Sequence, residues 1–251
     1  MKSNIPEVSV ITACFNSDCF IEQTIKSVIG QTFTNFEFII VDDCSSDKTV
    51  NIIKKYLRLD HRLKLYELSS NQGAAKARNY AINKSCGRFI AFLDSDDLWY
   101  KSKLKDQITF MLHNKYYFTY SYFQLVDEHS NFIKEVFVPR RICYKRLLSY
   151  QAIGCLTAIY DRQYFGTVYM PEIKRRQDFA LWLKLLKSVQ YAHCIPKNLA
   201  SYRIAKKSLS SNKLKAISFT FLVYYKIEKF GIIKSLFYLT MYLFNSFKRY
   251  I

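Results

Sequence analysis

The sequence predicts an α/β fold in which helices flank a mainly parallel, open β-sheet and a helical extension follows at the C-terminal end. Three observations support this fold class. Over the first hundred residues, runs rich in β-branched and aromatic residues alternate with amphipathic segments, an order that favours parallel strands joined by helices. Acidic clusters at 42–43 and 94–97 follow two of those runs. The segment from 213 onward is rich in Phe, Tyr, Leu and Lys at helical spacing.

The first half of the chain supplies the parallel part of the expected sheet. Its expected elements, in order, are a strand at 8–13, a helix at 16–31, a strand at 36–41, a helix at 47–57, a strand at 63–68, a helix at 73–85 and a strand at 88–93. We expect residues 16–18 and Asp47 to cap the first two helices. In open sheets of this kind, ligands bind beyond the carboxyl ends of the strands, where the acidic clusters lie.

The second half has a less regular pattern. Its expected elements are a helix at 101–113, a hairpin of strands at 116–127 and 132–138, an amphipathic helix at 177–189, and two helices after 213 that break near Gly231.

Charge and cysteine content indicate the partners and the compartment. Lys and Arg total 38 against 20 Asp and Glu, a formal charge of +18, which favours nucleic acid, anionic lipid or phosphorylated substrates as partners. The seven cysteines include no Cys-x-x-Cys pair, so we expect free thiols in a reducing cytosol. We expect no secretory signal in 1–7 and no membrane span, because the uncharged run at 235–247 is shorter than the roughly 20 residues of a spanning helix.

Asp94 and Asp96 form an Asp-x-Asp pair at the end of the fourth expected strand. Side chains two apart on a strand point the same way, so these two carboxylates are expected to converge. A divalent cation relieves their repulsion and can also hold a diphosphate. Acidic turns after strands are common, however, and an Asp-Ser-Asp-Asp turn that caps the next helix explains the same residues.

Two further segments carry polar groups that suit a nucleotide. Asp42 and Asp43 end the second strand, and a carboxylate there can accept the N3–H of uracil, although ordinary turn chemistry is the alternative. Gly73 opens a helix that carries Lys76 and Arg78, and backbone N–H groups beside cations at a helix start suit an anionic ligand. The alternative here is a surface helix with two solvated cations.

Asp178 begins the amphipathic helix, directly after two arginines and Gln177. The helix dipole favours a carboxylate at this end, so we expect Asp178 to stay ionised and able to accept a proton. A plain helix-terminal charge is the alternative and the commoner use of such a residue.

Taken together, four segments resemble family 2 glycosyltransferases of the GT-A fold. They are VSVITACFN at 8–16, VDDCSSDKT at 41–49, NQG with ARN within 71–79, and GRFIAFLDSDD at 87–97. Their order and spacing resemble the nucleotide-binding half of that family over about 6–110, and four ordered motifs make a specific signal. A fainter match continues to about 210 through 175–184. The resemblance is closest to enzymes of bacterial surface-polysaccharide assembly, including the teichuronic-acid type.

The resemblance implies a role for each matched residue. Asp178 matches the catalytic base, although the family often has Glu where this sequence has Gln177. Asp96, together with Asp94, matches the metal-binding element for Mn²⁺ or Mg²⁺. Contacts with the nucleotide-sugar are implied for Thr12, Ala13, Phe15, Asp43 at the uracil, Arg78, Asp94 and Ser95.

The resemblance also implies an organisation of the chain. Residues 1–98 form the nucleotide-sugar-binding half of a GT-A domain, and 99–211 form its acceptor-binding and catalytic half. Within the latter, 202–211 resembles a mobile loop that closes over the diphosphate. Residues 212–251 form a basic, aromatic helical tail, which either associates with an anionic membrane surface or packs on the catalytic domain.

The implied activity is an inverting, metal-dependent hexosyl transfer in cell-surface polysaccharide synthesis. The expected donor is a nucleotide-sugar, with UDP as the expected nucleotide, and the expected acceptor is a hydroxyl of a glycan or a lipid-linked glycan. We expect a cytoplasmic protein, peripheral at the inner face of the bacterial plasma membrane. A non-enzymatic basic protein that binds membranes or nucleic acid is the alternative; nucleic acid is disfavoured because carboxylates at strand ends repel phosphate. A pyrophosphorylase or a dinucleotide-dependent oxidoreductase is also disfavoured, because 10–16 holds no Gly or basic residue and no Gly-x-Gly-x-x-Gly follows the first strand.

Overall fold

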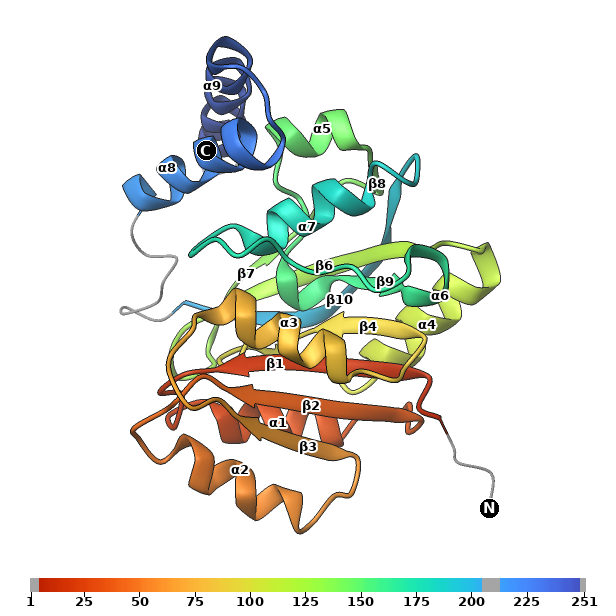
Figure 1. The fold of residues 1–251 in the computed structure, drawn as a ribbon. Coiled ribbons are helices and arrows are strands. Elements are labelled where there is room, and N and C mark those ends of the chain that lie inside the picture. The colour runs from red at the N-terminus through yellow and green to blue at the C-terminus, as the bar shows by residue number, and fades with distance from the viewer. Residues whose placement is uncertain (1–4, 205–212, 249–251) are drawn as a thin grey trace.

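The computed structural model describes residues 5–204 and 213–248 (Figure 1). Within them, ten strands form one sheet in the order β3-β2-β1-β4-β9-β6-β10-β5, with β7 paired to β6 and β8 paired to β10. The strands are β1 (Val8–Cys14), β2 (Phe36–Asp42), β3 (Leu63–Glu67), β4 (Phe89–Phe92), β5 (Leu98–Trp99), β6 (Phe118–Val126), β7 (Phe132–Val136), β8 (Arg141–Ile142), β9 (Ile159–Asp161) and β10 (Ala192–Arg203). The helices are α1 (Ile21–Ile29), α2 (Thr49–Leu57), α3 (Ala74–Lys84), α4 (Lys103–Asn114), α5 (Tyr144–Ser149), α6 (Arg162–Phe165), α7 (Gln177–Leu185), α8 (Lys213–Leu222) and α9 (Ile232–Lys248).

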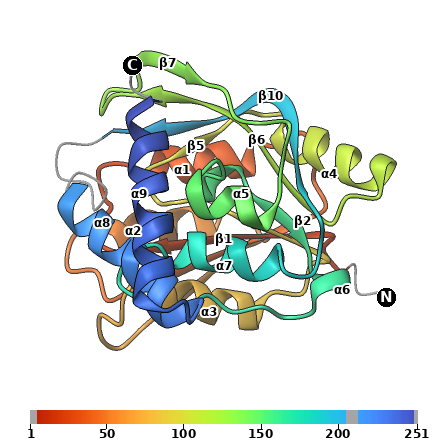
Figure 2. The same cartoon turned by 90° about the horizontal axis from the view of Figure 1, so that it is seen from above.

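The first half of the chain has the predicted alternation of strands and helices. β3, β2, β1 and β4 are parallel neighbours, and α1 and α3 lie on opposite sides of β1 (Figure 2). Every residue of β2 is buried, as expected for a strand covered on both faces. The start of α1 differs from the prediction. Residues 17–20 form a turn in which the carbonyl of Ser17 accepts the N–H of Phe20 and of Ile21, so the helix begins at Ile21.

The second half makes the sheet mixed, so the prediction of a mainly parallel sheet is correct only for the first half. β9 pairs antiparallel with both β4 and β6, and β5 pairs antiparallel with β10, whereas β10 and β6 are parallel. The predicted hairpin is confirmed, because β6 and β7 pair antiparallel.

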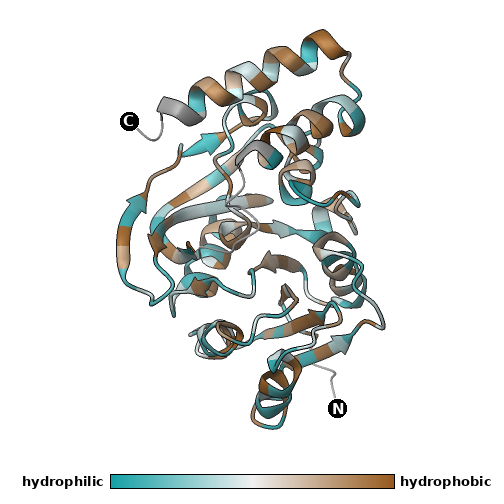
Figure 3. Ribbon diagram, turned by 90° about the vertical axis from the view of Figure 1, so that its left-hand side faces the viewer, coloured by the Kyte–Doolittle hydropathy of each residue, from teal (hydrophilic) through white to brown (hydrophobic). Residues whose placement is uncertain are grey.

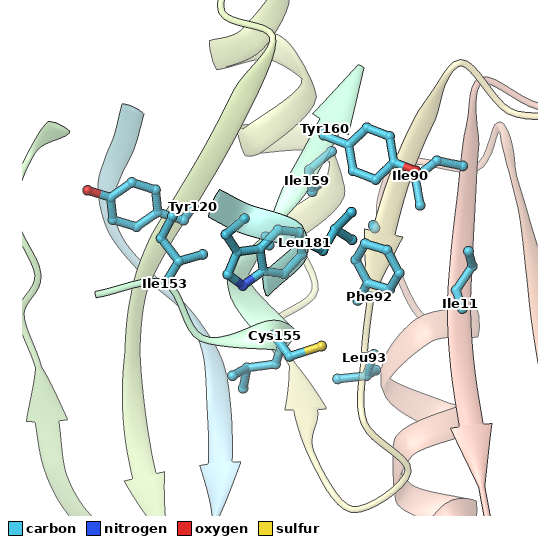
Figure 4. Packing of buried hydrophobic residues seen from close by; sticks show 14 of the residues in the cluster. Ile11, Ile90, Phe92, Leu93, Tyr120, Ile153, Cys155, Ile159, Tyr160 and Leu181 are labelled. Atoms are coloured by element: carbon cyan, nitrogen blue, oxygen red, sulfur yellow. The ribbon is translucent and has the colours of Figure 1, made fainter. Parts of the chain in front are cut away.

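An aromatic core fixes α7 against the sheet. The Trp182 ring of α7 lies 5.6 Å from the Phe92 ring and 5.3 Å from the Phe118 ring, measured between ring centroids. Phe92 also stacks on Tyr160 of β9, and Figure 4 shows these two rings beside Leu181. Burial of each such side chain stabilises the fold by about 1.5–3 kcal/mol. The helix that carries Asp178 is therefore held against the sheet by Trp182, one turn after Asp178.

The C-terminal helices pack on the second half of the chain near α5 and α7 (Figure 1). The predicted break near Gly231 is confirmed, but α8 ends at Leu222 and a π-helical turn follows at Val223–Ile227. This turn buries Val223 and Tyr224, and the Tyr224 hydroxyl donates to the carbonyl of Leu148. The wider π turn thus places two successive side chains in the core.

Lys103 of α4 is a buried cation that the sequence does not reveal. Its side chain has no exposed surface, its Nζ donates to Oε1 of Gln107 at 2.7 Å, and it lies 4.4 Å from the centre of the Trp99 ring. Burial lowers the pKa of Lys103 from its ordinary value of 10.5 to about 7. The folded protein therefore releases this proton at a lower pH than the unfolded chain does.

We expect this shift to make stability depend on pH. Between about pH 7 and 10.5 the unfolded chain binds the Lys103 proton and the folded protein does not, so stability rises with pH over that range by at most about 1.4 kcal/mol per unit. Lys103→Met should remove this rise. The measurement is the free energy of unfolding of both proteins in urea at pH 7 and pH 9.5. A difference in the free energy of unfolding between the two proteins that is the same at both pH values would contradict the prediction.

Candidate active site

The acidic cluster at 94–97 forms a turn directly after β4. The N–H of Asp97 donates to the carbonyl of Asp94, so Asp94 and Asp96 lie in a turn. They do not lie on the strand from which the sequence predicted that their side chains converge. One oxygen of Asp94 accepts a hydrogen bond from Nη2 of Arg78 at 2.5 Å. Arg78 comes from α3 and is 8 % exposed, so its cation lies in the protein beside this carboxylate. The alternative of a solvated cation at Arg78 is therefore wrong.

Asp96 and Asp97 are carboxyl groups whose ionised forms are disfavoured by burial. Burial and, secondarily, the charge of Asp94 raise the pKa of Asp96 from 3.8 to about 6. Asp97 is almost fully buried; its Oδ1 accepts the N–H of Arg203, and its Oδ2 has no hydrogen-bond partner. Burial raises the pKa of Asp97 well above its usual range. Oxygen atoms in this state suit a hard cation such as Mn²⁺ or Mg²⁺.

The protein alone does not complete a metal site here. Across 5–204 and 213–248, no group of three or more His, Cys, Asp or Glu side chains is placed to hold a metal ion. Asp94 is already paired with Arg78, which leaves Asp96 as the carboxylate best able to contact a cation.

The segments expected to bind the nucleotide meet at the carboxyl ends of β1, β2 and β4. Thr12 is fully buried and its hydroxyl donates to the carbonyl of Leu93 at 2.7 Å, so its side chain serves to join β1 to the segment after β4. The Phe15 ring is 48 % exposed beyond the end of β1. Ser95 shares a hydrogen bond of 2.8 Å with the hydroxyl of Ser17. Ala13, which lies between Thr12 and Phe15 in the chain, is partly buried.

Asp43 connects the end of β2 to the start of α3. Its two carboxylate oxygens accept the N–H groups of Gln72 and Gly73, each at 2.7 Å, and the residue is 3 % exposed. The carboxylate thus fixes the glycine that opens α3, where φ is 89° and a side chain would be strained. Each oxygen keeps a further lone pair for a ligand. Lys76, the other cation of this segment, instead lies 3.8 Å from Glu172 at the surface.

Asp178 lies in the first turn of α7, near enough to the acidic turn for the charge of Asp94 to act on it. The charges of Arg78, Arg176 and Asp94 all act on it, which places it on the same side of the molecule as the Asp94–Arg78 pair. Burial raises the pKa of Asp178, and the two arginines oppose that rise. The sequence predicts that the helix dipole favours the ionised carboxylate; in the structure burial opposes this form, and Arg78 and Arg176 support it.

Sequence reasoning missed three contributors to the site. The resemblance places Arg203 in a loop that closes over the diphosphate. In the structure this residue ends β10, is 1 % exposed, and its Nε donates to the carbonyl of Asp96 at 2.8 Å. Residues 206–211 of that proposed loop lie outside the described part of the chain. Cys155 is buried close enough to Asp94 and Asp178 for their charges to raise its pKa. Arg176 contacts the C-terminal helix, and no local pattern in the sequence indicates that contact.

Comparisons with known proteins identify the family of the chain. The family model described as "Glycosyl transferase family 2" matches residues 9–165. The chain is 40 % identical to TuaG of Bacillus subtilis over 245 residues, 97 % of each chain; the name of that protein places it in teichuronic acid biosynthesis as a glycosyltransferase. It is 37 % identical over 212 residues to WfgD of Escherichia coli, named a UDP-Glc:alpha-D-GlcNAc-diphosphoundecaprenol beta-1,3-glucosyltransferase, covering 84 % of this chain and 82 % of that one.

A solved structure shows the same fold. TarS 1–349 of S. aureus, in complex with UDP-GlcNAc, superposes with a TM-score of 0.75 at 23 % identity, over 96 % of this chain and 73 % of that one. The predicted fold class is thereby confirmed, including the helices after the sheet. Since the family model covers more than half of the chain and the relatives align along nearly its whole length, the chain belongs to the family 2 glycosyltransferases.

Proposed function

We propose that this chain is an inverting, metal-dependent transferase that moves a hexose from a UDP-sugar to a hydroxyl of a lipid-linked glycan during cell-surface polysaccharide synthesis. The observation that carries the proposal is the convergence of Asp94, Arg78 and Asp178, from three separate segments, within reach of one another's charges. The relatives named as acting in teichuronic acid biosynthesis and on a diphosphoundecaprenol-linked sugar support the acceptor class.

Residues 1–98 are proposed to bind the donor and 99–211 the acceptor. On the donor side, Asp43 is proposed to accept the N3–H of uracil with the lone pairs that Gln72 and Gly73 leave free. The exposed ring of Phe15 offers a face for the base, and the segment from Thr12 to Ala13 lines the same pocket. Ser95 and Arg78 are proposed to lie beside the nucleotide at the acidic turn.

Asp96 is proposed to hold the divalent cation, with Asp94 held in place beside it by Arg78. The fit is supported by the hard oxygen donors of this turn and by the absence, among the described residues, of a cationic side chain hydrogen-bonded to the carboxylate of Asp96. When bound, the cation supplies positive charge that makes the nucleoside diphosphate a better leaving group.

Asp178 is proposed to act as the general base. It takes the proton from the acceptor hydroxyl as that oxygen attacks C1 of the sugar, and direct displacement inverts the anomeric centre. An α-linked donor then gives a β-linked product. The raised pKa of Asp178 brings its basicity closer to neutral pH, which favours proton transfer, while Arg78 and Arg176 help to keep it ionised before the reaction.

The test of this function is a donor and acceptor screen. UDP-glucose, UDP-GlcNAc, GDP-mannose and a dTDP-sugar are offered with Mn²⁺ and a synthetic α-GlcNAc-diphosphate-lipid, and release of the nucleoside diphosphate is measured. We expect turnover with a UDP-sugar and a β-linked product by NMR. Thermal shift with each donor is measured in parallel, because hydrolysis without the correct acceptor is slow. Salt-sensitive nucleic-acid binding without any donor binding would instead favour the non-enzymatic alternative.

We also propose that α9 holds the protein at the inner face of the plasma membrane. No helix within the described residues is long and apolar enough to cross a bilayer. The side of α9 that faces away from the protein is instead exposed and largely apolar, and Figure 3 shows hydrophobic segments along this helix. Its exposed apolar residues on that side are Ile233, Leu236, Phe237, Met241 and Phe244. Lys234 in α9, with Lys226 and Lys229 just before it, adds exposed positive charge that anionic headgroups attract.

A pair of surface variants tests the membrane proposal. Ile233→Glu combined with Phe237→Glu should lower binding to phosphatidylglycerol vesicles about tenfold or more in cosedimentation, because two apolar side chains and two charges change at the interface. The control is Leu59→Glu, a residue 76 % exposed after α2 at the other end of the molecule (Figure 1). Equal pelleting of both variants and the wild type would rule out this face as the membrane contact.

A further inference from the structure

α9 has a second side, which packs on the catalytic half. At 100° per residue, Ser235, Tyr238, Leu239, Tyr242 and Asn245 lie opposite the exposed apolar side, and each of them is at least partly buried. Asn245 donates from Nδ2 to the carbonyl of Ser149 at 3.0 Å, which ties the helix to the end of α5. The helix therefore has a defined register on the protein and does not merely rest on it.

One contact of this side leads to the segment of the proposed base. Nη2 of Arg176 donates to the hydroxyl of Tyr242 at 2.8 Å, and Nη1 of the same guanidinium donates to Oε1 of Gln151. Arg176 immediately precedes α7, two residues before Asp178. A single arginine thus joins the C-terminal helix, the segment after α5 and the start of the helix that carries Asp178.

The backbone at Arg176 is held in an unfavourable conformation. Its φ is 65°, in the left-handed region, which is unfavourable for a residue with a side chain and persists only where the surroundings enforce it. The two hydrogen bonds of the guanidinium hold the side chain at both ends of its fork. Without them, this residue is free to relax, and the first turn of α7 would move with it.

Arg176 also acts on Asp178 through its charge. Three charged groups act on Asp178: Arg176 from its own segment, Arg78 from α3 and Asp94 from the acidic turn. The two arginines favour the ionised carboxylate, and Asp94 opposes it. The position of the Arg176 guanidinium therefore matters for both the geometry and the charge of the carboxylate.

We propose that Tyr242 is a positioning residue for the transfer reaction: through Arg176 it holds the start of α7, so that the C-terminal helix forms part of the catalytic apparatus. This inference rests on the proposed function, in which Asp178 is the base. Tyr242 touches no reacting atom, and its hydroxyl acts only by way of the guanidinium. The loss of a hydrogen bond to a charged group is expected to lower kcat about tenfold.

The experiment compares Tyr242→Phe with Tyr225→Phe, which removes a hydroxyl from a half-exposed tyrosine of the same tail. Turnover is measured as UDP release from UDP-glucose with the α-GlcNAc-diphosphate-lipid acceptor, or with the best pair of the screen, and donor affinity is measured by UDP titration. We expect Tyr242→Phe to lower kcat about tenfold with donor affinity unchanged, and Tyr225→Phe to match the wild type. An effect on donor affinity equal to that on kcat, or equal losses in both variants, would overturn the proposal.

A double-mutant cycle makes the test specific to the Arg176 contact. Arg176→Lys keeps the charge but loses the two-ended guanidinium contact, and it should lower kcat by a similar factor. Tyr242→Phe in that background should then cause little further loss. If the kcat of the double variant falls by the product of the two single losses, Tyr242 acts by a route other than Arg176. If Asp178→Asn keeps activity, the assignment of the base in the proposed function fails; if Asp178→Asn is inactive but Tyr242→Phe is not impaired, only this inference fails.

Discussion

Asp178→Asn should lower kcat by about 10²–10⁴-fold, the usual effect of removing a general base. The amide keeps nearly the same shape but cannot take the proton of the acceptor hydroxyl. Donor affinity should stay within about twofold of the wild type, because the proposed donor contacts come from other segments. The measurements are single-turnover rates with the acceptor present and UDP titration by calorimetry.

The stability of this variant separates a chemical role from a structural one. Because burial raises the pKa of Asp178, the folded protein disfavours its charge, and a neutral Asn should leave Tm unchanged or slightly higher at neutral pH. The matched control is Asp106→Asn on α4, where the carboxylate pairs with the exposed Lys197 at 3.1 Å. Wild-type turnover in Asp178→Asn, with the assigned acceptor, would refute the assignment of the base.

Asp96→Asn should abolish the response to Mn²⁺. The cation is proposed to contribute several kcal/mol to the leaving of the diphosphate, so kcat/KM at saturating Mn²⁺ should fall by about a hundredfold or more. In this variant Mn²⁺ should no longer strengthen UDP binding, since the carboxylate that is proposed to contact the ion is gone. The measurement is UDP affinity with and without Mn²⁺, for the variant and the wild type.

The interpretation of Asp96→Asn again needs a control for folding. Burial disfavours the charge of Asp96, so the amide should not destabilise the protein, and a lower Tm would point to a structural role instead. Asp106→Asn again serves as the matched acid-to-amide change. An unaltered Mn²⁺ effect on UDP affinity in Asp96→Asn would remove this residue from the metal site.

Local patterns in the sequence predicted the first half of the fold and most of the candidate site. The strands β1, β2 and β4 are buried runs rich in β-branched and aromatic residues, and the motifs that follow them bring Asp43, Arg78 of α3 and Asp94 to one edge of the sheet. These predictions succeed because strand, turn and helix signals act over a few residues. Alternation of strands and helices then fixes which ends meet.

What the sequence did not reveal depends on contacts between distant residues. The antiparallel pairing of β9 and the position of β10 between β6 and β5 follow from packing in the second half, where alternation is lost. The pairing of Arg176 with Tyr242 joins residues 66 positions apart, and Arg203 reaches Gln23 across 180 positions. Burial likewise opposes the ionised form of Asp178, an effect that depends on the packing around α7.

The place of β10 in the sheet determines how short an active recombinant fragment can be. The family match ends at residue 165, yet β10 lies between β6 and β5, and Tyr224 fills the core from the tail. A fragment trimmed to the family match would leave β6 with an open edge prone to aggregation. Expression of the catalytic unit should therefore retain the chain through Asn245, whose hydrogen bond to Ser149 closes the last helix onto the protein.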